Sequence, residues 1–584
     1  MASEHVTLEA PLETPLVPDT GAATGVALGY PVETLELVER FIDDVRPLRV
    51  AVIGAGLAGI TAGVLLPVKV PGIELTIFDK NADVGGTWFE NIYPGVRCDI
   101  PAHVYQATFA PNTQWTEQFA QGSEILQYWK DIAKRYDVYR HLKLSHRVNE
   151  AVWDDNTSTW AVNVTNLAGG ETAVHTFDFV LTAIGRFNDW RLPDYPGLTD
   201  FKGVLRHASN WDPIFDPAGK AVAVIGNGAS GIQLVPNLQP IVSRLDHYAR
   251  NKTWIAGSWA GDERTFEPQY YSEEQRESFK DPATYLAFRK ELEDKYWRRF
   301  AALFRGSGEN AGAREHFTQL MRERSGGKLD DLIPDFSPNC RRPTPGPRYL
   351  ESLTEPNVDY IRTPIARFTA TGIETVDGKH REVDAIICAT GANIDMAPPF
   401  PIRARRTDLK EAWKDFPHTY MGLATPGFPN LLFIHGPHGT GASGTVPQSV
   451  EVQLTYFAKL LRKASREGVK TIEPSQKATD EFAAYNDAFF ARTVLSDPCS
   501  SWYNGGKTGG RVHGLFPGSA AHVTAVRREP RWEDWEYTYL EANRFAWYFG
   551  NGWSRREQDP DADMTPYLAG GDLRDLHESW WSLP

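Results

Sequence analysis

The first half of the chain alternates short apolar runs with glycine-containing turns, a pattern typical of buried parallel strands that lead into helices. The segment from Arg49 to Gly63 reads RVAVIGAGLAGITAG, which predicts a strand, a tight turn and a helix. A second apolar run, ELTIFDK, follows and carries Asp79 near its end. From Lys220 the same pattern returns as KAVAVIGNGASGIQLV. This repeated order of strand, turn and helix predicts an α/β fold.

Two further apolar runs are similar to each other and indicate how the rest of the chain is organised. DFVLTAIG ends at Gly185, and DAIICATG ends at Gly391. We therefore predict two similar units, with the second nested inside the first. A charged stretch at about 261–332 shows helical apolar spacing and predicts a helical insertion. We interpret this insertion as a solvated lid rather than as part of the chemistry.

One apolar segment, from Ala51 to Val68, is about long enough to raise the question of a membrane span. Its regularly placed glycines fit a strand, a turn and a packed helix better than a span, and Lys69 follows at once. We therefore expect a buried strand and helix here, and no membrane as a partner.

The first glycine turn, Gly54-Ala-Gly56-Leu-Ala-Gly59, has the spacing of a dinucleotide-binding fingerprint. The first glycine allows the tight turn, the second lets a pyrophosphate approach the backbone, and the third lets the helix pack closely on the strand. Asp79 lies twenty residues after Gly59, where a carboxylate can accept hydrogen bonds from a ribose diol. The alternative is a tight turn with a structural role only.

The second glycine turn repeats the device but differs at the position that selects the cofactor. It runs Gly226-Asn-Gly228-Ala-Ser230-Gly231. About nineteen residues later the chain reads Arg250-Asn251-Lys252, with two cations where a carboxylate would select NAD. A guanidinium there can bind a ribose 2′-phosphate with two hydrogen bonds, which favours NADPH over NADH. An ordinary arginine at a strand end is the alternative.

Two such turns in one chain predict two bound dinucleotides, and the first unit of such pairs usually holds FAD. The predicted architecture is thus two Rossmann-like domains with a helical insertion. The expected order is an extended arm at 1–40, the FAD-binding domain at 41–195, the NADPH-binding domain at 196–380, and the second part of the FAD-binding domain with a C-terminal segment at 381–584. A flavin facing a nicotinamide is suited to hydride transfer.

Composition and cysteine usage narrow the function classes. A net charge of -14 disfavours a nucleic-acid surface. The four cysteines are far apart and form no CxxC pair, which disfavours a disulfide scaffold, a zinc ribbon and a dithiol reductase, and favours a reduced intracellular compartment. No HExxH motif occurs, so we predict no metal. The N-terminus lacks a signal-peptide pattern and the chain does not end in SKL, so we expect a cytoplasmic protein. An oxygenase becomes the leading hypothesis.

Two longer motifs identify the chain as similar to a known family. Phe201-Lys-Gly203-Val-Leu-Arg-His207-Ala-Ser-Asn-Trp211-Asp212 resembles the FxGxxxHxxxW(P/D) signature of Baeyer–Villiger monooxygenases. A second signature of that family, GGxWxxxxYPGxxxD, is met from Gly85 to Asp99. The resemblance covers about residues 48–550. It implies that NADPH reduces FAD, that dioxygen forms a flavin peroxide, and that the peroxide converts a ketone to an ester or lactone.

The resemblance also implies roles for particular residues. Arg342, the second residue of an Arg-Arg pair between the insertion and the next strand, matches the catalytic arginine, and Arg341 matches the cation that helps to hold the NADPH phosphate. Asp99 matches the acid near the flavin that pairs with the arginine. Further matches to cofactor contacts are Gly86, Thr87, Trp88, Arg97, Cys98, Tyr105, Val148 and Trp502. A double arginine on the surface and a plain core tryptophan are the alternatives.

His207 and Trp211 lie between the two units, and we interpret them as a hinge that couples NADP binding to domain rotation, with a purely structural histidine as the alternative. The family commonly has an aromatic residue after ATG, whereas this chain has Ala392. The segments CRRPTPGP, GFPNLLFIHGP and PRWEDWEY look most like fungal members that act on bulky cyclic or long-chain ketones.

The predicted partners are therefore a small-molecule ketone and dioxygen, with a monomer slightly favoured. Two other functions are weighed against ketone oxidation. An N- or S-oxygenating flavin monooxygenase is disfavoured by Trp211, which is Tyr or Phe in those enzymes, and by the arginine pair. A flavoprotein that has become a binding module is disfavoured because both glycine turns, Arg342 and Asp99 are intact.

Overall fold

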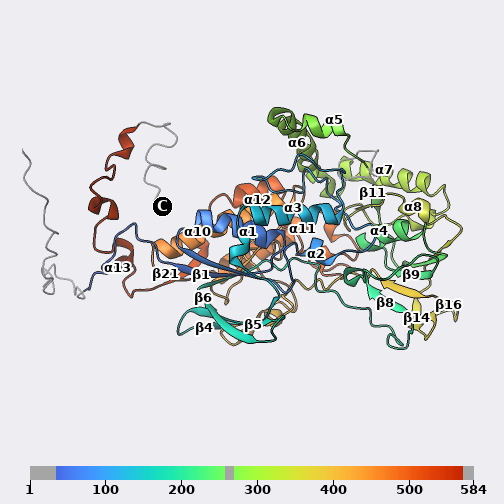
Figure 1. The fold of residues 1–584 in the computed structure, drawn as a ribbon, viewed down its shortest axis with the longest axis horizontal. Helices are drawn as coiled ribbons and strands as arrows, with labels where there is room; N and C mark the ends of the chain where they lie inside the picture. Colours follow the sequence, from blue (N-terminus) through green and yellow to red (C-terminus); the bar gives the residue numbers. More distant parts are fainter. Residues whose placement is uncertain (1–34, 257–268, 570–584) are drawn as a thin grey trace, which may run out of the picture. The chain divides into compact units, whose positions relative to one another are not determined.

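In the computed structural model of this protein, residues 35–256 and 269–569 are described (Figure 1). The chain divides into two compact units. The larger comprises Val45–Ser465 and Val469–Thr538, and the smaller comprises Met1–Asp44, Arg466–Gly468 and Tyr539–Pro584. Each unit is described by itself below.

The first sheet of the larger unit is parallel and has the strand order β20-β7-β1-β2-β3. Its strands are β1 (Leu48–Ile53), β2 (Ile73–Phe78), β3 (Leu142–Lys143), β7 (Phe179–Thr182) and β20 (Leu431–Phe433). The predicted strand, turn and helix at the start of the chain are confirmed, since β1 runs directly into helix α1 (Leu57–Lys69). The sheet is accompanied by α2 (Thr87–Glu90), α3 (Gly122–Arg135) and the 3₁₀ helix η1 (Val138–His141).

The second sheet is also parallel, with the order β13-β10-β9-β17-β8. Its strands are β8 (Val204–His207), β9 (Ala221–Ile225), β10 (Arg244–Tyr248), β13 (Val358–Ile361) and β17 (Ala385–Cys388), with helices α4 (Ala229–Leu238) and α8 (Tyr349–Ser352). All of these strands lie between β7 and β20 in the chain, so the predicted nesting is confirmed. The predicted boundary at 380 differs from the structure, because β17 pairs with β9 and belongs to the second sheet.

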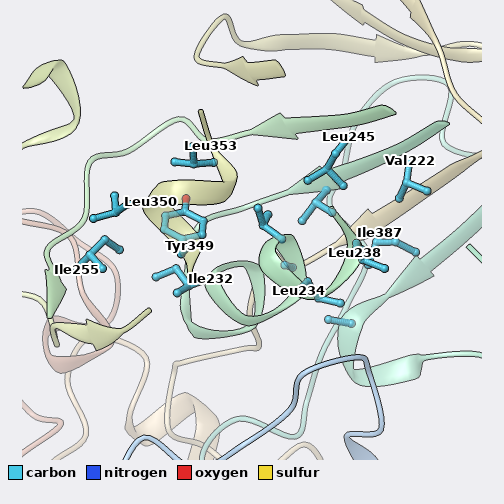
Figure 2. Packing of buried hydrophobic residues seen from close by; sticks show 14 of the residues in the cluster. Val222, Ile232, Leu234, Leu238, Leu245, Ile255, Tyr349, Leu350, Leu353 and Ile387 are labelled. Atoms are coloured by element: carbon cyan, nitrogen blue, oxygen red, sulfur yellow. The ribbon is translucent and has the colours of Figure 1, made fainter. Parts of the chain in front are cut away.

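The core of the second sheet forms where helices cover buried strands (Figure 2). Figure 2 shows Leu234 and Leu238 of α4 near Val222 and Ile387 of neighbouring strands. These side chains belong to one cluster of buried residues, each with less than about a tenth of its surface exposed. Burial of apolar surface at about 25 cal/mol per Å² holds such a sheet and its helices together.

A mixed sheet, which was not predicted from the sequence, packs beside the first parallel sheet through a shared apolar core. Its order is β19-β18-β4-β5-β6, with β4 (His146–Asp154), β5 (Thr159–Asn166), β6 (Thr172–Phe177), β18 (Ile402–Ala404) and β19 (Thr407–Asp408), followed by α9 (Leu409–Ala412). In this sheet β18 and β4 are parallel, and the other pairs are antiparallel. Smaller pairings join β14 (Ile365–Phe368), β15 (Gly372–Thr375) and β16 (His380–Glu382), and also β11 (Ile255–Ala256) and β12 (Thr344–Pro345).

The helical insertion is confirmed from residue 269 onward, while residues 257–268 lie outside the described part. It contains α5 (Glu273–Ser278), α6 (Pro282–Trp297), η4 (Arg298–Leu303), α7 (Gly308–Arg324) and η5 (Asp330–Leu332). Side chains of Ser272, Asp281 and Ser307 accept backbone hydrogen bonds at the helix starts, which satisfies donors that helix geometry leaves unpaired.

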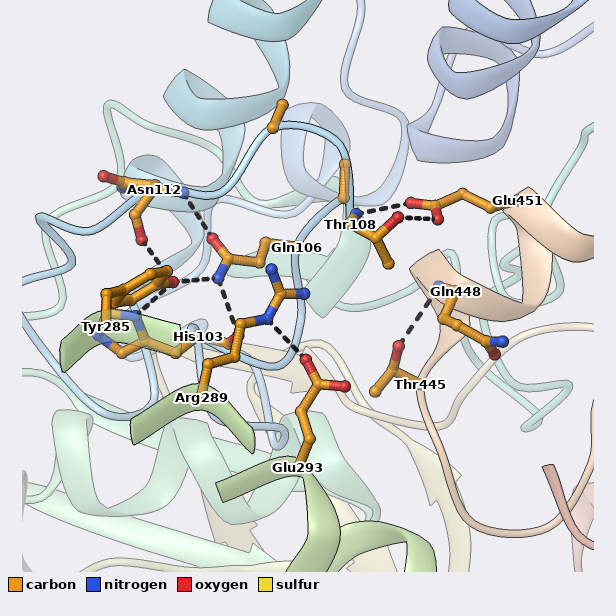
Figure 3. Close-up of polar contacts among 12 residues, drawn as sticks. His103, Gln106, Thr108, Asn112, Tyr285, Arg289, Glu293, Thr445, Gln448 and Glu451 are labelled. Atoms are coloured by element: carbon orange, nitrogen blue, oxygen red, sulfur yellow. Dashed lines mark hydrogen bonds and ion pairs between the residues drawn. The ribbon is translucent and has the colours of Figure 1, made fainter. Parts of the chain in front are cut away.

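The insertion is docked on the loop that follows α2 by a buried polar cluster (Figure 3). The hydroxyl of Tyr285 on α6 accepts a hydrogen bond from Gln106 Nε2 at 2.6 Å and lies 3.1 Å from His103 Nδ1. Gln106 Oε1 also accepts from the backbone N–H of Asn112 at 2.7 Å. Buried polar groups generally need hydrogen-bond partners. The contacts of Tyr285 with His103 and Gln106 therefore hold α6 in place on this loop.

The C-terminal part of the larger unit is mostly helical. Its elements are α10 (Val446–Arg466), β21 (Val469–Pro474), α11 (Gln476–Phe490), η6 (Val494–Ser496), η7 (Trp502–Asn504), α12 (Ala520–Val526), η8 (Trp532–Asp534) and β22 (Trp535–Tyr539). Within the smaller unit, α13 (Arg544–Phe549), η9 (Arg555–Gln558) and η10 (Pro566–Ala569) follow. There the guanidinium of Arg40 donates to the carbonyl of Trp547 at 2.6 Å. Most of the predicted N-terminal arm, residues 1–34, lies outside the described residues.

The described residues contain neither a membrane-spanning helix nor a cluster of metal ligands. None of the helices in 35–256 and 269–569 combines the length and the apolar character that a membrane crossing needs. Within the same ranges, no group of three or more His, Cys, Asp or Glu side chains is arranged to hold a metal ion.

Candidate active site

Both glycine turns open into one cavity of about 2070 Å³. Its wall includes Gly54 and Gly56 of the first turn, Gly226 and Gly228 of the second, and Arg342. Pockets for a single drug-sized ligand have volumes of about 300–1,000 Å³, so this cavity has room for more than one such molecule. The fold therefore brings the two predicted nucleotide sites into one continuous space.

The first glycine turn has the geometry that its spacing predicts. Gly54 has φ +113°, a conformation that side chains disfavour, and an added Cβ would clash with the carbonyl oxygen of Ala183. A Cβ at Gly59 would clash with the carbonyl oxygen of Gly54, so the third glycine lets helix α1 lie close to the turn. Gly56 is the N-cap of α1 and has no side-chain cap among the described residues. The helix N-terminus therefore faces the cavity with backbone N–H groups available to an anion.

Asp79 lies at the end of β2 with 8% of its surface exposed and lines the cavity. Its carboxylate accepts backbone hydrogen bonds from Ala55 at 2.6 Å and Asn81 at 2.8 Å. Burial raises the pKa of Asp79, although these hydrogen bonds oppose the shift. The side chain thus ties the glycine turn to the strand end, where a ribose would lie.

The other residues predicted to contact the flavin also reach the cavity. They are Gly86, Thr87, Trp88, Tyr105 and Val148. Trp88 and Tyr105 pack edge to face with ring centroids 5.7 Å apart. Gly86 has φ +52° and is the N-cap of α2, and an added Cβ there would come within 2.8 Å of Gly56 Cα. The two glycine-containing segments therefore approach each other closely beneath the cavity.

The second glycine turn repeats the first. Gly226 has φ +108°, and a Cβ at Gly231 would clash with the Gly226 carbonyl oxygen. Gly228 is the N-cap of α4, has no side-chain cap among the described residues, and faces open space. Ser230 lies on the same first turn of α4 and lines the cavity. These backbone groups fit a second pyrophosphate.

The residues after β10 divide into two groups. Arg250 and Asn251 line the cavity, and Asn251 accepts a hydrogen bond from Asn227 Nδ2 on its backbone carbonyl at 2.6 Å. Lys252 does not line the cavity, because its ammonium donates to the carbonyl of Ile333 at 3.1 Å. The structure therefore places Arg250 and Asn251, but not Lys252, on the cavity wall.

Arg342 and Asp99 form an ion pair at the cavity wall. Arg342 Nη2 and Nε lie 2.8 and 2.9 Å from Asp99 Oδ2. Arg342 keeps 33% of its side-chain surface exposed, and both residues line the cavity. Burial is the largest single influence on Arg342 and opposes its charge, but the charge and hydrogen bond of Asp99, together with Tyr503 and Cys98, raise the pKa of the guanidinium. The chain thus presents a permanent cation to the space between the two glycine turns.

Arg97 and Cys98 lie beside this pair with separate partners. Arg97 Nη1 forms an ion pair with Glu117 at 3.0 Å, and its backbone carbonyl accepts from Gln233 Nε2 at 3.0 Å. Gln233 belongs to α4, so this contact joins the two halves of the cavity. Burial raises the pKa of the Cys98 thiol, which therefore stays protonated at neutral pH.

Trp502 and Arg341 complete the predicted set, and both line the cavity. Trp502 packs edge to face on Phe187, with ring centroids 5.4 Å apart. The side chain of Ser501 caps the short helix η7 and fixes the start of this aromatic segment. Burial lowers the pKa of Arg341, which has no ion-pair partner among the described residues.

The geometry of His207 favours the structural alternative to a hinge. Its Nδ1 accepts from the backbone N–H of Ser209 at 3.1 Å, and its Nε2 lies 3.0 Å from the carbonyl of Gly391. The ring stacks on Trp190 with centroids 5.1 Å apart. Trp190 also forms a backbone bridge with Ala392, the residue that stands where the family commonly has an aromatic after ATG. Trp211 packs against the core of the second sheet.

Arg186 lines the cavity and was missed by the sequence analysis. Its guanidinium donates to the carbonyls of His435 (3.1 Å), Gly514 (2.6 Å) and Gly436 (3.0 Å) and lies 5.2 Å from the Trp502 ring. Burial lowers its pKa to about 10. The sequence holds no signal for this role, because the acceptors are backbone carbonyls of distant loops.

The insertion also contributes to the cavity wall, which changes the interpretation of a solvated lid. Lining residues from it include Tyr296, Arg299, Leu303, His316 and Phe317. The guanidinium of Arg299 stacks 4.4 Å from the Tyr296 ring. Aromatic and aliphatic side chains therefore line the insertion side of the cavity together with cations.

The cysteine usage disfavoured a disulfide scaffold, but the described part of the structure contains one disulfide. Cys340 and Cys499 form a disulfide, with Cα atoms 6.3 Å apart and a sequence separation of 159. Cys98 and Cys388 are free and buried. Sequence spacing could not reveal this pair, because only the tertiary fold brings the two segments together.

Comparisons with known proteins agree with this geometry. The family model described as Flavin-binding monooxygenase-like matches residues 47–263. FAD-binding monooxygenase moxY of the fungus Dothistroma septosporum is 34% identical over 554 residues, which cover 92% of this chain and 87% of that protein. A Baeyer-Villiger monooxygenase of Streptomyces coelicolor is 30% identical over 499 residues, covering 83% of this chain and 91% of that protein.

Solved structures of flavin-dependent monooxygenases have a similar fold. The crystal structure of OTEMO in complex with FAD and NADP superimposes with a TM-score of 0.72 at 25% identity, covering 84% of this chain and 99% of that chain.

Proposed function

This chain belongs to the Baeyer–Villiger monooxygenase family of flavoprotein monooxygenases, and from that premise we propose that it inserts one oxygen atom of dioxygen beside a ketone carbonyl to give an ester or lactone. FAD and NADPH are the cofactors, and a small-molecule ketone and dioxygen are the substrates. The two uncapped helix N-termini at Gly56 and Gly228 support this proposal, since they offer two separate pyrophosphate sites in one cavity.

The observation that carries the proposal is the Arg342–Asp99 ion pair at the wall between the two glycine turns. Bound FAD would supply the chemistry with dioxygen, and bound NADPH the hydride. Arg342 provides a fixed positive charge for the negative charge that develops on oxygen near a ketone. In a cavity that excludes water, such a charge contributes several kcal/mol.

Asp99 acts through Arg342. By accepting hydrogen bonds from both Nε and Nη2, it holds the plane of the guanidinium in one orientation. The protonated Cys98 thiol next to it is unsuited to act as a nucleophile, because burial raises its pKa. The residues around the cation therefore orient it and do not compete with the ketone.

The test compares Arg342→Ala with the parent on a panel of ketones, with NADPH consumption and mass detection of a one-oxygen gain. We expect the variant to bind FAD and to oxidise NADPH, while ester formation falls at least about 100-fold. Arg322→Ala is the matched control, since Arg322 is 56% exposed and pairs with Asp330 outside the cavity.

Ester formation at the parent rate by Arg342→Ala would contradict the role of the arginine. A parent enzyme that adds oxygen to amines or sulfides but to no ketone would contradict the proposed reaction and favour N- or S-oxygenation.

A further inference from the structure

We propose that the Cys340–Cys499 disulfide is a positioning element for the reaction, which holds the segment of Arg342 against the segment of Trp502. The inference rests on the proposed function, because it assigns a purpose to a bond beside the catalytic arginine. Cys340 comes two residues before Arg342, and Cys499 three residues before Trp502. Since consecutive Cα atoms are about 3.8 Å apart, the bond restrains both side chains at short range.

The two segments come from different parts of the fold. Cys340 lies in the connection from the insertion to β12, and Cys499 lies between η6 and η7 in the C-terminal part of the larger unit. Both half-cystines are buried, with 0% and 4% of their surface exposed. The disulfide is therefore a covalent link between the connection that carries the arginine and the segment that carries Trp502, and both of these residues line the cavity.

The first segment has few other restraints before Arg342. Asn339 has φ +70°, which places a turn directly before the half-cystine. The amide of Asn310 on α7 donates to the Pro338 carbonyl at 3.1 Å, and the N–H of Cys340 donates to the Ser337 carbonyl at 3.2 Å. Pro343 follows Arg342 and stiffens the far side. The disulfide completes the restraint on the near side.

The second segment is also organised around its half-cystine. The amide of Asn504 donates to the Cys499 carbonyl at 2.9 Å, and the Ser501 side chain caps η7. Tyr503, next to Trp502, is one of the groups whose proximity raises the pKa of Arg342. The tether thus joins two segments whose side chains already interact electrostatically.

Loss of the bond has a defined chemical form. A dithiol reductant gives two electrons and two protons to the disulfide, the S–S bond breaks, and two thiols form while the reductant becomes a disulfide. The two segments are then held by noncovalent contacts alone, and the second segment keeps its ion pair between Asp497 and Arg305 of the insertion at 2.8 Å. Greater motion of both segments lowers the fraction of NADPH oxidation that yields product and raises the release of hydrogen peroxide.

The first test counts thiols. The parent protein is denatured without reductant, alkylated with N-ethylmaleimide and weighed as an intact chain. We expect two alkylated residues, Cys98 and Cys388, and four after treatment with dithiothreitol. Four alkylated residues without reductant would overturn the proposal.

The second test measures positioning with the double variant Cys340→Ser/Cys499→Ser. We expect backbone hydrogen exchange over residues 335–345 and 497–506 to rise about tenfold, as for segments that open locally. With a ketone substrate, we expect at least about a twofold rise in hydrogen peroxide released per NADPH. Cys388→Ser is the matched control, because Cys388 is a free thiol with 0% exposure in β17.

Unchanged exchange and unchanged peroxide release in the double variant would overturn the positioning role. If the double variant does not accumulate, the same two measurements are made on the parent before and after dithiothreitol. A parent that oxygenates no ketone contradicts the proposed function, while the thiol count and the exchange data still decide whether the tether holds the two segments.

Discussion

Two arginines at the cavity differ in their partners. Arg342 is paired with the carboxylate of Asp99, whereas all four hydrogen bonds from Arg186 go to uncharged oxygens. A buried guanidinium without a carboxylate is costly, so it is retained where its donors satisfy several carbonyls at once. Arg186 ties the end of β7 to the loops around Gly436 and Gly514.

Replacement of Arg186 by Met should therefore loosen these loops. The change leaves three buried carbonyls without their donor, and we expect the free energy of unfolding to fall by about 3–5 kcal/mol. Arg186→Lys, which keeps the charge but loses the fork of donors, should lie between Met and the parent. Urea unfolding of the three proteins measures the order, and equal stability of Met and parent would refute the account.

Of the two cations predicted to select NADPH after β10, only Arg250 lines the cavity. We expect Arg250→Ala to raise the KM for NADPH by about 10- to 100-fold, the value of one charge-assisted interaction, and to leave the KM for NADH almost unchanged. Lys252→Ala is the internal comparison, since its ammonium donates to the Ile333 carbonyl. Steady-state kinetics with both nucleotides provides the measurement, and an equal loss with NADH would remove Arg250 from the 2′-phosphate site.

At this scale the sequence predicted residues whose roles depend on local spacing. The glycines of both turns, Asp79 and the Arg342–Asp99 pair lie where the motifs placed them. Arg186 and the pair Cys340–Cys499 could not be predicted, because their partners are set by contacts between distant segments. Lys252 could not be excluded from the cavity by spacing, because its ammonium donates to the carbonyl of Ile333, a contact with a distant segment.

Among the elements, helix α6 is docked on the loop that contains His103, and this docking depends on an uncharged histidine. His103 is 0% exposed and is surrounded by the rings of Tyr271, Phe279, Tyr285 and Phe288. Burial lowers the pKa of His103 to about 3, and the positive charge of Arg289 adds to the shift. Protonation therefore opposes docking of the insertion.

This attachment should weaken in acid. The unfolded histidine titrates near pH 6.5 and the folded one near 3, so the unfolded state binds more protons between these values and stability falls as the pH decreases. Between pH 7 and 5 the contribution of His103 is about 2 kcal/mol. In His103→Gln, the acid-induced loss in urea unfolding should be smaller than in the parent by about that amount, and an identical loss in both proteins would refute the assignment.

The periodicity of the sequence predicted the parallel strands and the insertion helices well, because each forms from one continuous apolar pattern. It did not predict the antiparallel pairing of β4, β5 and β6, because buried positions alternate with less buried ones along β5, and β6 is exposed at every residue but its last. Nor did it predict that β17 pairs with β9, since the identity of a neighbouring strand is a property of the fold.

For the larger unit as a whole, the nested order of strands means that the two sheets need different parts of the chain to be complete. All strands of the second sheet lie within residues 204–388, whereas the first sheet needs β20 at 431–433 to cover β7. An uncovered β7 would present an open edge of hydrogen-bonding groups.

Fragments should show this difference. We expect a fragment of residues 196–392 to fold with a cooperative thermal transition and to retain NADP⁺ binding, and a fragment of residues 41–195 to show no such transition. Circular dichroism during heating and calorimetric titration with NADP⁺ measure both properties. Cooperative unfolding of the shorter fragment would show that β20 is dispensable.

The late position of β20 also matters while the protein is being made. A ribosome that adds about 5–20 residues each second needs roughly 20–90 s to reach Phe433. Until then β7 of the first sheet has no β20 to pair with. The second sheet, which is complete by Cys388, can assemble first on the nascent chain. Biogenesis of this enzyme would then proceed from its middle outward, with chaperones needed chiefly by the segment that is synthesised first.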